Sequence, residues 1–378
     1  MFVSIRSLSS ALSLLLVNIV AAPLSAQQVS EIEQDYPGIR VEQVVAGLGV
    51  PWGMTFLSPD RLLLTERSGT VRLLDMESGS TVQLSGTPEV VAEGQGGMLD
   101  VAIGPNYATE GWIYFTYTRR SKSEAATTLA RARLAGHRLL EWEDLLVTDS
   151  ATDSRRHFGS RIAFDDKGHV FFGVGDRGKR DMAQDLSNHV GTIMRLNLDG
   201  SVPTDNPFVG IDNARDEIWS YGHRNPQGLL FDRVTGRLWS IEHGPRGGDE
   251  INLIIKRRNY GWPVISHGKE YWGPVSIGEG TSKPGMEAPR KVYIPSIAPG
   301  SLIIYRGKAF PAWRGNLFAG ALKLQHLNRI MLSDSGNVIG EERILEDLGE
   351  RIRALAQGPE GWIYFSTDSG RILRIRPR

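Results

Sequence analysis

Four basic residues and one histidine are the residues whose types suggest chemistry: Arg224, Lys323, Arg351, Arg353 and His157. Guanidinium groups bind carboxylates and phosphates through paired hydrogen bonds, so a cluster of them predicts a polyanionic ligand that is planar or forked. Positive charge beside His157 would lower its pKa and favour the neutral imidazole, which accepts a proton. Considered alone, His157 could equally be a structural histidine. Considered alone, the Arg351–Arg353 pair could equally belong to a solvated strand face. The hypothesis therefore depends on whether the fold brings them together.

The elements that must position these residues are short strands that recur along the chain. Six runs of aromatic and β-branched residues each follow one anchor residue in a turn, namely Asp60, Gly111, Gly168, Gly236, Gly315 and Gly361. The intervals between the anchors are 51, 57, 68, 79 and 46 residues, and each holds further strand-like runs. Several strands per repeat with almost no helical periodicity predict an all-β fold, a six-bladed β-propeller of four-stranded antiparallel blades. A pair of β-sandwiches is the alternative, which the near-regular recurrence disfavours.

The chemically distinctive residues share a phase within this repeat. One group precedes its anchors by 8–16 residues and comprises Gln95, His157, Arg224, Arg351 and Arg353. A second group follows its anchors by 8 or 9 residues and comprises Gly244, Pro245 and Lys323. One strand of five or six residues, roughly 17–20 Å long, separates an anchor turn from the opposite end of the sheet. Both groups are therefore predicted to reach the same face and to form one composite site.

Composition excludes several classes of function. The 378 residues include 43 Lys and Arg against 43 Asp and Glu, which argues against a nucleic-acid partner or a polybasic membrane contact. The chain has no cysteine, so disulfides, thiolate nucleophiles, zinc–thiolate sites and cysteine-bound iron–sulfur clusters are excluded.

The first 26 residues are typical of a secretory signal peptide rather than of the fold. A basic start and an apolar, serine-rich run lead to small residues before Gln27, with cleavage expected after Ala26 or, alternatively, Ala22. A membrane anchor is the competing interpretation, but the run is shorter than the roughly 20 residues of a spanning helix. We expect a periplasmic or secreted protein without stable membrane insertion, and one catalytic domain over residues 27–378.

Two other motifs resemble known sites only in part. Residues 173–178 match a dinucleotide-binding glycine pattern, but neither an apolar helix nor a βαβ unit follows. Residues 198–201 with Asp205 resemble part of a calcium loop, yet they lack its alternating carboxylates and distal glutamate, which favours a plain turn.

Several segments together resemble the soluble quinoprotein sugar dehydrogenases of the glucose/sorbosone dehydrogenase family, which use pyrroloquinoline quinone (PQQ). The segments are 94–99, 156–161, 221–228, 242–252, 259–263 and 351–353. Their order and spacing match over most of the chain, and the periplasmic aldose sugar dehydrogenases are the branch most similar to it.

The resemblance implies a reaction and roles for the two central residues. His157 is similar to the base that removes the proton of the C1 hydroxyl of an aldose, while hydride passes from C1 to PQQ and the lactone forms. Arg224 would stabilise negative charge on the quinone oxygen. An aldose is the implied substrate; the electron acceptor is not identified, and a quinone and a cytochrome are the two candidates.

The resemblance also implies residues that bind PQQ and Ca²⁺. Gln95 and Asn225 would contact the cofactor or substrate. The PQQ carboxylates would pair with Lys323, Arg351 and Arg353. The backbone carbonyls of Gly244 and Pro245 would bind a catalytic Ca²⁺, and a second Ca²⁺ is implied at Glu250 and Tyr260.

One departure from the family concerns the support of the base. Arg156 stands where the soluble glucose dehydrogenase branch has an aspartate before the histidine, so any carboxylate that orients His157 must come from elsewhere. The chain is also shorter than that branch, which predicts an open pocket, broad aldose specificity and a monomer. The alternatives are a calcium-dependent hydrolase or lactonase propeller with His157 as base, and a non-catalytic propeller that binds peptide or glycan.

Overall fold

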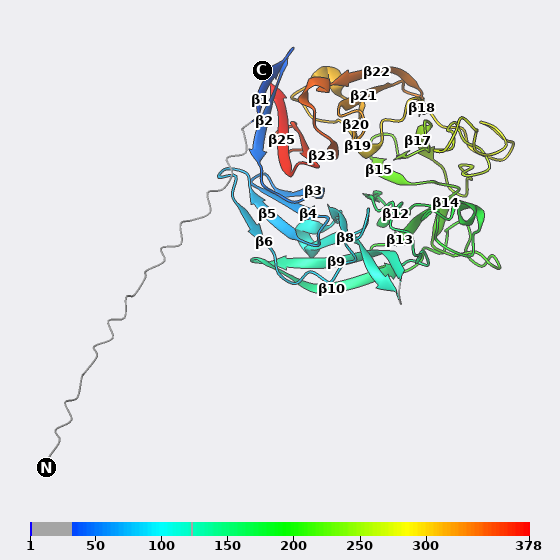
Figure 1. The fold of residues 1–378 in the computed structure, drawn as a ribbon, viewed down its shortest axis with the longest axis horizontal. Helices are drawn as coiled ribbons and strands as arrows, with labels where there is room; N and C mark the ends of the chain where they lie inside the picture. The colour runs from blue at the N-terminus through cyan, green and yellow to red at the C-terminus, as the bar shows by residue number, and fades with distance from the viewer. Residues whose placement is uncertain (2–31, 122–123) are drawn as a thin grey trace. The chain divides into compact units, whose positions relative to one another are not determined.

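A computed structural model describes Met1 and residues 32–121 and 124–378. The predicted signal peptide, residues 1–26, lies outside the described residues except for Met1, so it stays a prediction. Within residues 32–378 the strands form six antiparallel sheets arranged in a ring (Figure 1). The predicted all-β, six-bladed β-propeller is therefore confirmed. In the described part of the chain, no helix has the length and apolar character needed to cross a membrane.

Five blades are built from consecutive strands, and the sixth combines strands from both ends of the chain. Blade 1 contains β3 (Pro51–Ser58), β4 (Arg61–Glu66), β5 (Val71–Asp75) and β6 (Thr81–Gln83). Blade 2 contains β7 (Met98–Ile103), β8 (Trp112–Ser121), β9 (Glu124–Ala135) and β10 (Arg138–Val147). Blade 3 contains β11 (Ile162–Phe164), β12 (His169–Val174), β13 (Thr192–Asn197) and β14 (Ile218–Tyr221).

The remaining three blades follow the same order. Blade 4 contains β15 (Pro226–Asp232), β16 (Arg237–Glu242), β17 (Asp249–Ile254) and β18 (Lys291–Tyr293). Blade 5 contains β19 (Pro299–Ile304), β20 (Leu317–Ala321), β21 (Leu327–Leu332) and β22 (Val338–Ile344). Blade 6 contains β23 (Ile352–Gln357), β24 (Ile363–Thr367), β25 (Arg371–Pro377), β2 (Ile39–Val45) and β1 (Glu33–Tyr36). The short helices are α1 (Tyr107–Glu110) and the 3₁₀ turns Arg180–Gln184, Pro311–Trp313 and Glu346–Leu348.

The six anchored runs are the second strand of every blade, namely β4, β8, β12, β16, β20 and β24. The five glycine anchors have left-handed backbone, which glycine adopts at little cost; Gly168, for example, has φ of +85°. The repeat therefore marks the hairpin between the first and second strands of each blade.

The ring is closed by the N-terminal strand β2, which pairs with β25 in the same sheet. Blue β2 lies beside red β25 in Figure 1. Glu42 of β2 forms ion pairs with Arg374 at 2.9 Å and Arg376 at 2.6 Å. The sixth sheet consequently has five strands. The anchors could not reveal this, because residues 33–45 precede the first of them.

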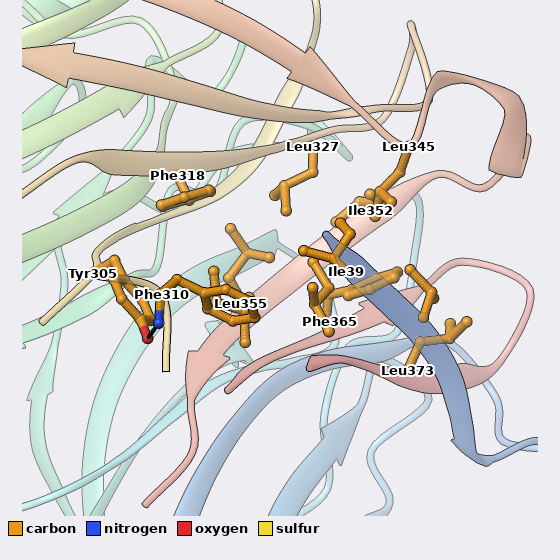
Figure 2. Packing of buried hydrophobic residues seen from close by; sticks show 13 residues of the cluster. Ile39, Tyr305, Phe310, Phe318, Leu327, Leu345, Ile352, Leu355, Phe365 and Leu373 are labelled. Carbon is orange, nitrogen blue, oxygen red and sulfur yellow. Dashed lines mark hydrogen bonds between the residues drawn. The ribbon is translucent and has the colours of Figure 1, made fainter. Parts of the chain in front are cut away.

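Apolar side chains fill the space between each pair of neighbouring blades. Six clusters of buried residues correspond to the six blade interfaces. Figure 2 shows the one between blades 5 and 6, where Phe318 and Leu327 of blade 5 face Ile352, Leu355 and Phe365 of blade 6. Burial of each such side chain contributes roughly 1.5–3 kcal/mol. Every blade thus depends on both neighbours for its core.

At the centre of the ring, all six blades meet at one buried side chain, Arg161, which directly precedes β11 of blade 3. Each of the other five innermost strands supplies one contact. These contacts are Asp100 Oδ1 at 2.7 Å, the carbonyl oxygens of Gln227 at 3.0 Å, Gly300 at 2.7 Å and Arg353 at 3.4 Å, and the ring of Trp52 at 4.0 Å. Arg161 therefore joins the blades across the central channel.

Replacing Arg161 by Met is expected to lower the free energy of unfolding by about 3–5 kcal/mol, because it leaves Asp100 buried and unpaired. Urea unfolding followed by tryptophan fluorescence measures this change. Arg233→Met is the matched control, since Arg233 lies at the exposed mouth of the channel, 61% exposed and 3.3 Å from Asp166. The control should cost at most about 1 kcal/mol. Equal losses in both variants would contradict a special role for Arg161.

Candidate active site

The predicted site residues lie near the ends of the innermost and second strands that face one end of the channel. Here a cavity of about 350 Å³ is lined by residues that lie in, or lead directly into, all six blades. Four predicted residues line it together, Gln95, Asn225, Arg351 and Arg353. The phase of the repeat predicted three of these side chains, and the resemblance implied Asn225; the four converge although they are separated by up to 258 positions in the sequence.

His157 directly precedes two residues that line this cavity and is held in a fixed orientation, although it is not itself a lining residue. Its backbone N–H donates to Gln95 Oε1 at 2.7 Å, and the next two residues, Phe158 and Gly159, line the cavity. The backbone is left-handed, with φ of +58°, a conformation that a non-glycine residue adopts only when its surroundings hold it there. The imidazole Nδ1 lies 2.5 Å from Asp176 Oδ1.

Asp176 is the carboxylate that orients His157, and the sequence analysis missed it. Its Oδ1 also accepts the Gly178 N–H at 2.7 Å, and its Oδ2 accepts the Trp262 indole N–H at 2.8 Å. Burial by itself would raise the pKa of Asp176. The hydrogen bond from His157 and the nearby positive charge outweigh that effect, so the pKa lies below its usual value. An ionised Asp176 only accepts, so His157 carries its proton on Nδ1 and leaves Nε2 free to accept a proton.

Burial also keeps His157 neutral. Burial and the charge of Arg224 lower the pKa of His157 below 6.5, although Asp176 opposes the shift. A second histidine, His243, lines the cavity but is a weaker candidate base. Burial lowers its pKa to about 4, and its Nε2 lies 2.7 Å from the carbonyl oxygen of Pro299.

Arg224 lies beside His157, on the wall of a smaller adjoining cavity. Its guanidinium donates to the carbonyl oxygens of His243 at 3.1 Å and Gly244 at 2.7 Å. It also lies 5.2 Å from the ring of Trp262 and 3.5 Å from the hydroxyl of Tyr271. The Nε of Arg224 and the Nδ2 of Asn225 are buried with no hydrogen-bond partner among the described residues. These two donors remain available to a ligand.

Arg351 and Arg353 form the basic wall of the cavity, but Asp368 partly neutralises them. Arg353 Nε lies 2.5 Å from Asp368 Oδ1, and Arg351 Nε lies 2.9 Å from Oδ2. Burial raises the pKa of Asp368, but the two arginines lower it more, so the carboxylate is ionised at neutral pH. The pair brings two positive charges against one negative charge. Lys323 is exposed and follows Leu322, which lines the cavity; Lys323 itself is not a lining residue.

Glu250 and Tyr260 line the smaller cavity together with Glu242. Glu242 and Glu250 face each other in the register of β16 and β17. Glu242 accepts hydrogen bonds from the Arg224 backbone N–H at 2.7 Å and from Asn252 at 3.0 Å, whereas the carboxylate of Glu250 has, among the described residues, a single 3.4 Å contact with Asn252. Removal from water and the charge of Glu242 raise the pKa of Glu250 to about 8. This side chain is therefore mostly protonated at neutral pH, and a cation bound beside it would favour its ionised form.

The oxygen atoms of the other predicted metal-binding residues are partly engaged. The hydroxyl of Tyr260 donates to the carbonyl oxygen of Leu253 at 2.6 Å and accepts the Ile255 N–H at 2.9 Å, so its backbone carbonyl is the oxygen better placed to bind a cation. The carbonyl of Gly244 accepts from Arg224, and that of Pro245 accepts from Ser296 at 3.2 Å. Each of these two oxygens retains a second lone pair. Within the described ranges, no three His, Asp or Glu side chains gather at one point.

Four residues near the cavity escaped the sequence analysis: Arg67, Asp176, His243 and Asp368. Asp176 carried the same signal as the second group of predicted residues, because it follows its anchor Gly168 by eight positions, and the other three each follow an anchor by seven. Asp176 lies inside the glycine pattern at 173–178. A Cβ at Gly175 would lie 2.5 Å from the carbonyl oxygen of His157. That glycine therefore permits close packing beside the histidine.

Comparisons with known proteins agree with one another. The family model described as Glucose / Sorbosone dehydrogenase matches residues 48–374. Aldose sugar dehydrogenase YliI of Escherichia coli (strain K12) is 40% identical over 356 residues, 90% of this chain and 93% of the relative. The crystal structure of the soluble aldose sugar dehydrogenase from Escherichia coli in the apo form matches with a TM-score of 0.87 and 37% identity, covering 90% of this chain and 100% of the other. The PQQ-bound aldose sugar dehydrogenase from Streptomyces coelicolor matches with a TM-score of 0.73 and 25% identity, covering 90% and 98%.

The His157–Asp176 pair makes a prediction about titration. We expect an NMR titration of the imidazole to give His157 a pKa below 6.5, so that it is neutral at pH 7. Asp176→Asn should lower that pKa further, because it removes the charge that stabilises the imidazolium. Asp165→Asn is the matched control, since Asp165 pairs with another histidine, His169, at 2.8 Å. A His157 pKa above 6.5, or one that rises in Asp176→Asn, would contradict this assignment.

Proposed function

The chain belongs to the glucose/sorbosone dehydrogenase family, and on that premise we propose that it oxidises the C1 hydroxyl of aldose sugars to the lactone with PQQ as cofactor. The observation that carries the proposal is the neutral His157, held by Asp176 beside a cavity whose wall carries Arg351 and Arg353. The imidazole can accept a proton, and the two arginines can bind carboxylates.

The residues around the cavity fit PQQ. Three arginines line it against one carboxylate, and Asn225 and Arg224 offer buried N–H groups that have no partner among the described residues. When bound, PQQ supplies a two-electron acceptor and Ca²⁺ supplies a Lewis acid beside it. Arg351, Arg353 and the exposed Lys323 would pair with the carboxylates, while Gln95 and Asn225 would orient the ring or the sugar.

The role of the protein's own residues in the reaction is to move one proton. Nε2 of His157 takes the proton of the C1 hydroxyl, the C1–O bond becomes double, and the C1 hydrogen leaves with its electron pair to the acceptor. Asp176 holds the imidazole by Nδ1 and stabilises the imidazolium as it forms. Arg224, close enough to lower the pKa of His157, would stabilise the negative charge that develops on the acceptor.

Calcium fits best at Glu250, the carboxylate with only one long hydrogen bond. Ca²⁺ prefers six to eight oxygen ligands, including carboxylate and backbone carbonyl oxygens. Glu250 and the carbonyl of Tyr260 would hold one ion, and the carbonyls of Gly244 and Pro245 would contribute to a catalytic one. At Gly244 the ion would share the oxygen with Arg224, whose charge opposes it.

The competing functions receive less support from the site. A calcium-dependent hydrolase or lactonase needs several carboxylate side chains around one metal, and the described residues offer no group of three. In the channel itself, Asp100 is paired with Arg161.

We also infer a monomeric, exported enzyme of broad aldose specificity that passes electrons to a quinone or cytochrome.

Reconstitution tests the function and the base together. Purified protein with PQQ and Ca²⁺ should reduce a dye when given aldoses, and omission of either cofactor should abolish the activity. His157→Gln should lower kcat by about 10²- to 10⁴-fold, because it removes general-base catalysis, and should leave the PQQ affinity unchanged. His169→Gln, in a histidine outside the cavity, should keep wild-type kcat. Full activity without PQQ, or in His157→Gln, would overturn the assignment.

Calcium removal gives a second prediction, read from stability. Calcium at 100 times its Kd should stabilise the wild-type protein by about 2.7 kcal/mol, which corresponds to several degrees in Tm. Glu250→Gln removes the charge that binds the ion, so calcium should no longer raise its Tm. Glu279→Gln makes the same charge change on an exposed loop residue and should respond like wild type. An equal calcium response in Glu250→Gln would refute this site.

A further inference from the structure

Arg67 is a basic residue of the central cavity that lacks the partners of its neighbours. Arg351 and Arg353 share Asp368, and Arg224 donates to backbone carbonyls. Arg67 also lines the cavity, yet among residues 32–121 and 124–378 no carboxylate lies within 4.0 Å of its guanidinium and no side-chain hydrogen bond engages it. Arg67 is half-buried, and the N–H groups of its guanidinium are available to hydrogen-bond a ligand.

The backbone of Arg67 is held in place on both sides. Its N–H donates to the carbonyl oxygen of Val50 at 2.9 Å, and its own carbonyl accepts the Met98 N–H at 3.2 Å. Gly97 packs directly against it, because a Cβ there would lie 1.8 Å from the Arg67 carbonyl oxygen and 2.9 Å from its Cγ. The side chain therefore starts from a fixed point on the cavity wall, directly after β4.

Arg67 stands where the cavity adjoins an outer groove of about 510 Å³. Arg67 and Asp368 line both spaces, and the groove is completed by Leu48, Gly49, Val50, Ser68, Ala92 and Ser369. A ligand in the cavity and one entering through the groove would both meet this guanidinium.

The charge of the cavity wall depends on Arg67. The charged lining residues are Arg67, Arg351, Arg353 and Asp368, which gives three positive charges against one negative, a net charge of +2. Without Arg67 the net charge is +1. Removal of Arg67 would therefore halve the net positive charge that a polyanionic ligand meets.

We propose that Arg67 is a further anion-binding residue of this site and that it binds a carboxylate. The inference rests on the proposed function. The carboxylate belongs either to the cofactor or to an acidic aldose such as a uronic acid, and the two sources share the same chemistry of recognition by a guanidinium.

Arg67→Gln tests this with two measurements. The first is the Kd of PQQ in the presence of Ca²⁺, measured by quenching of tryptophan fluorescence and so independent of turnover. The second is the ratio of kcat/KM for glucuronate to that for glucose. Loss of a charge-assisted hydrogen bond should raise the Kd or lower the ratio about 10- to 100-fold. Arg61→Gln is the matched control, because it removes the same charge at the opposite end of β4.

Each outcome decides the proposal. A weaker Kd for PQQ in Arg67→Gln alone identifies the cofactor carboxylate, and a lower glucuronate ratio with unchanged Kd identifies the substrate carboxylate. Unchanged values of both, or equal changes in Arg61→Gln, overturn the role of Arg67. If Arg67→Gln does not fold, Arg67→Lys serves instead, and its lost fork geometry should weaken the same quantity. Wild-type protein that neither binds PQQ nor oxidises an aldose would overturn the proposed function itself, and this inference with it.

Discussion

The contact on which the rest of the structure depends is the guanidinium of Arg161 in the central channel. A propeller has no single core, because each blade packs only against its two neighbours. Arg161 adds what the blade interfaces lack, a direct link among all six innermost strands. The planar fork of arginine suits this position, since its donors point in several directions within one plane.

The same link connects the scaffold to the candidate site. Gln227 and Arg353 line the cavity with their side chains, and both bind Arg161 through their carbonyl oxygens. A shift of one blade would therefore move the basic wall of the cavity relative to His157. Rigid support of this kind keeps a proton acceptor and an anion-binding wall at a constant separation, which positioning in catalysis requires.

The electrostatics of the site combine buried charges from distant segments. Asp176 keeps its negative charge in spite of burial because His157, Trp262 and Gly178 donate to it. The residue directly before the histidine is Arg156 and not an acidic residue, so Asp176 supplies the negative charge beside the imidazole instead. A carboxylate from the end of β12 thus serves the same purpose as one adjacent in sequence. Orientation of the imidazole needs a charge near Nδ1, and it does not matter where in the chain that charge originates.

The sequence by itself determined the number of blades, the strand that each anchor begins, and the end of the channel at which Gln95, Arg351 and Arg353 meet. These properties follow from local patterns, because strand length and turn position set the phase of every residue within its own blade. Only the tertiary structure decided that β2 closes the ring, that Asp176 supports His157, that Asp368 offsets the arginine pair, and that Arg161 joins the blades. Each of these depends on which residues of different blades approach one another. No spacing within one repeat encodes that distance, since it arises from the closure of the ring.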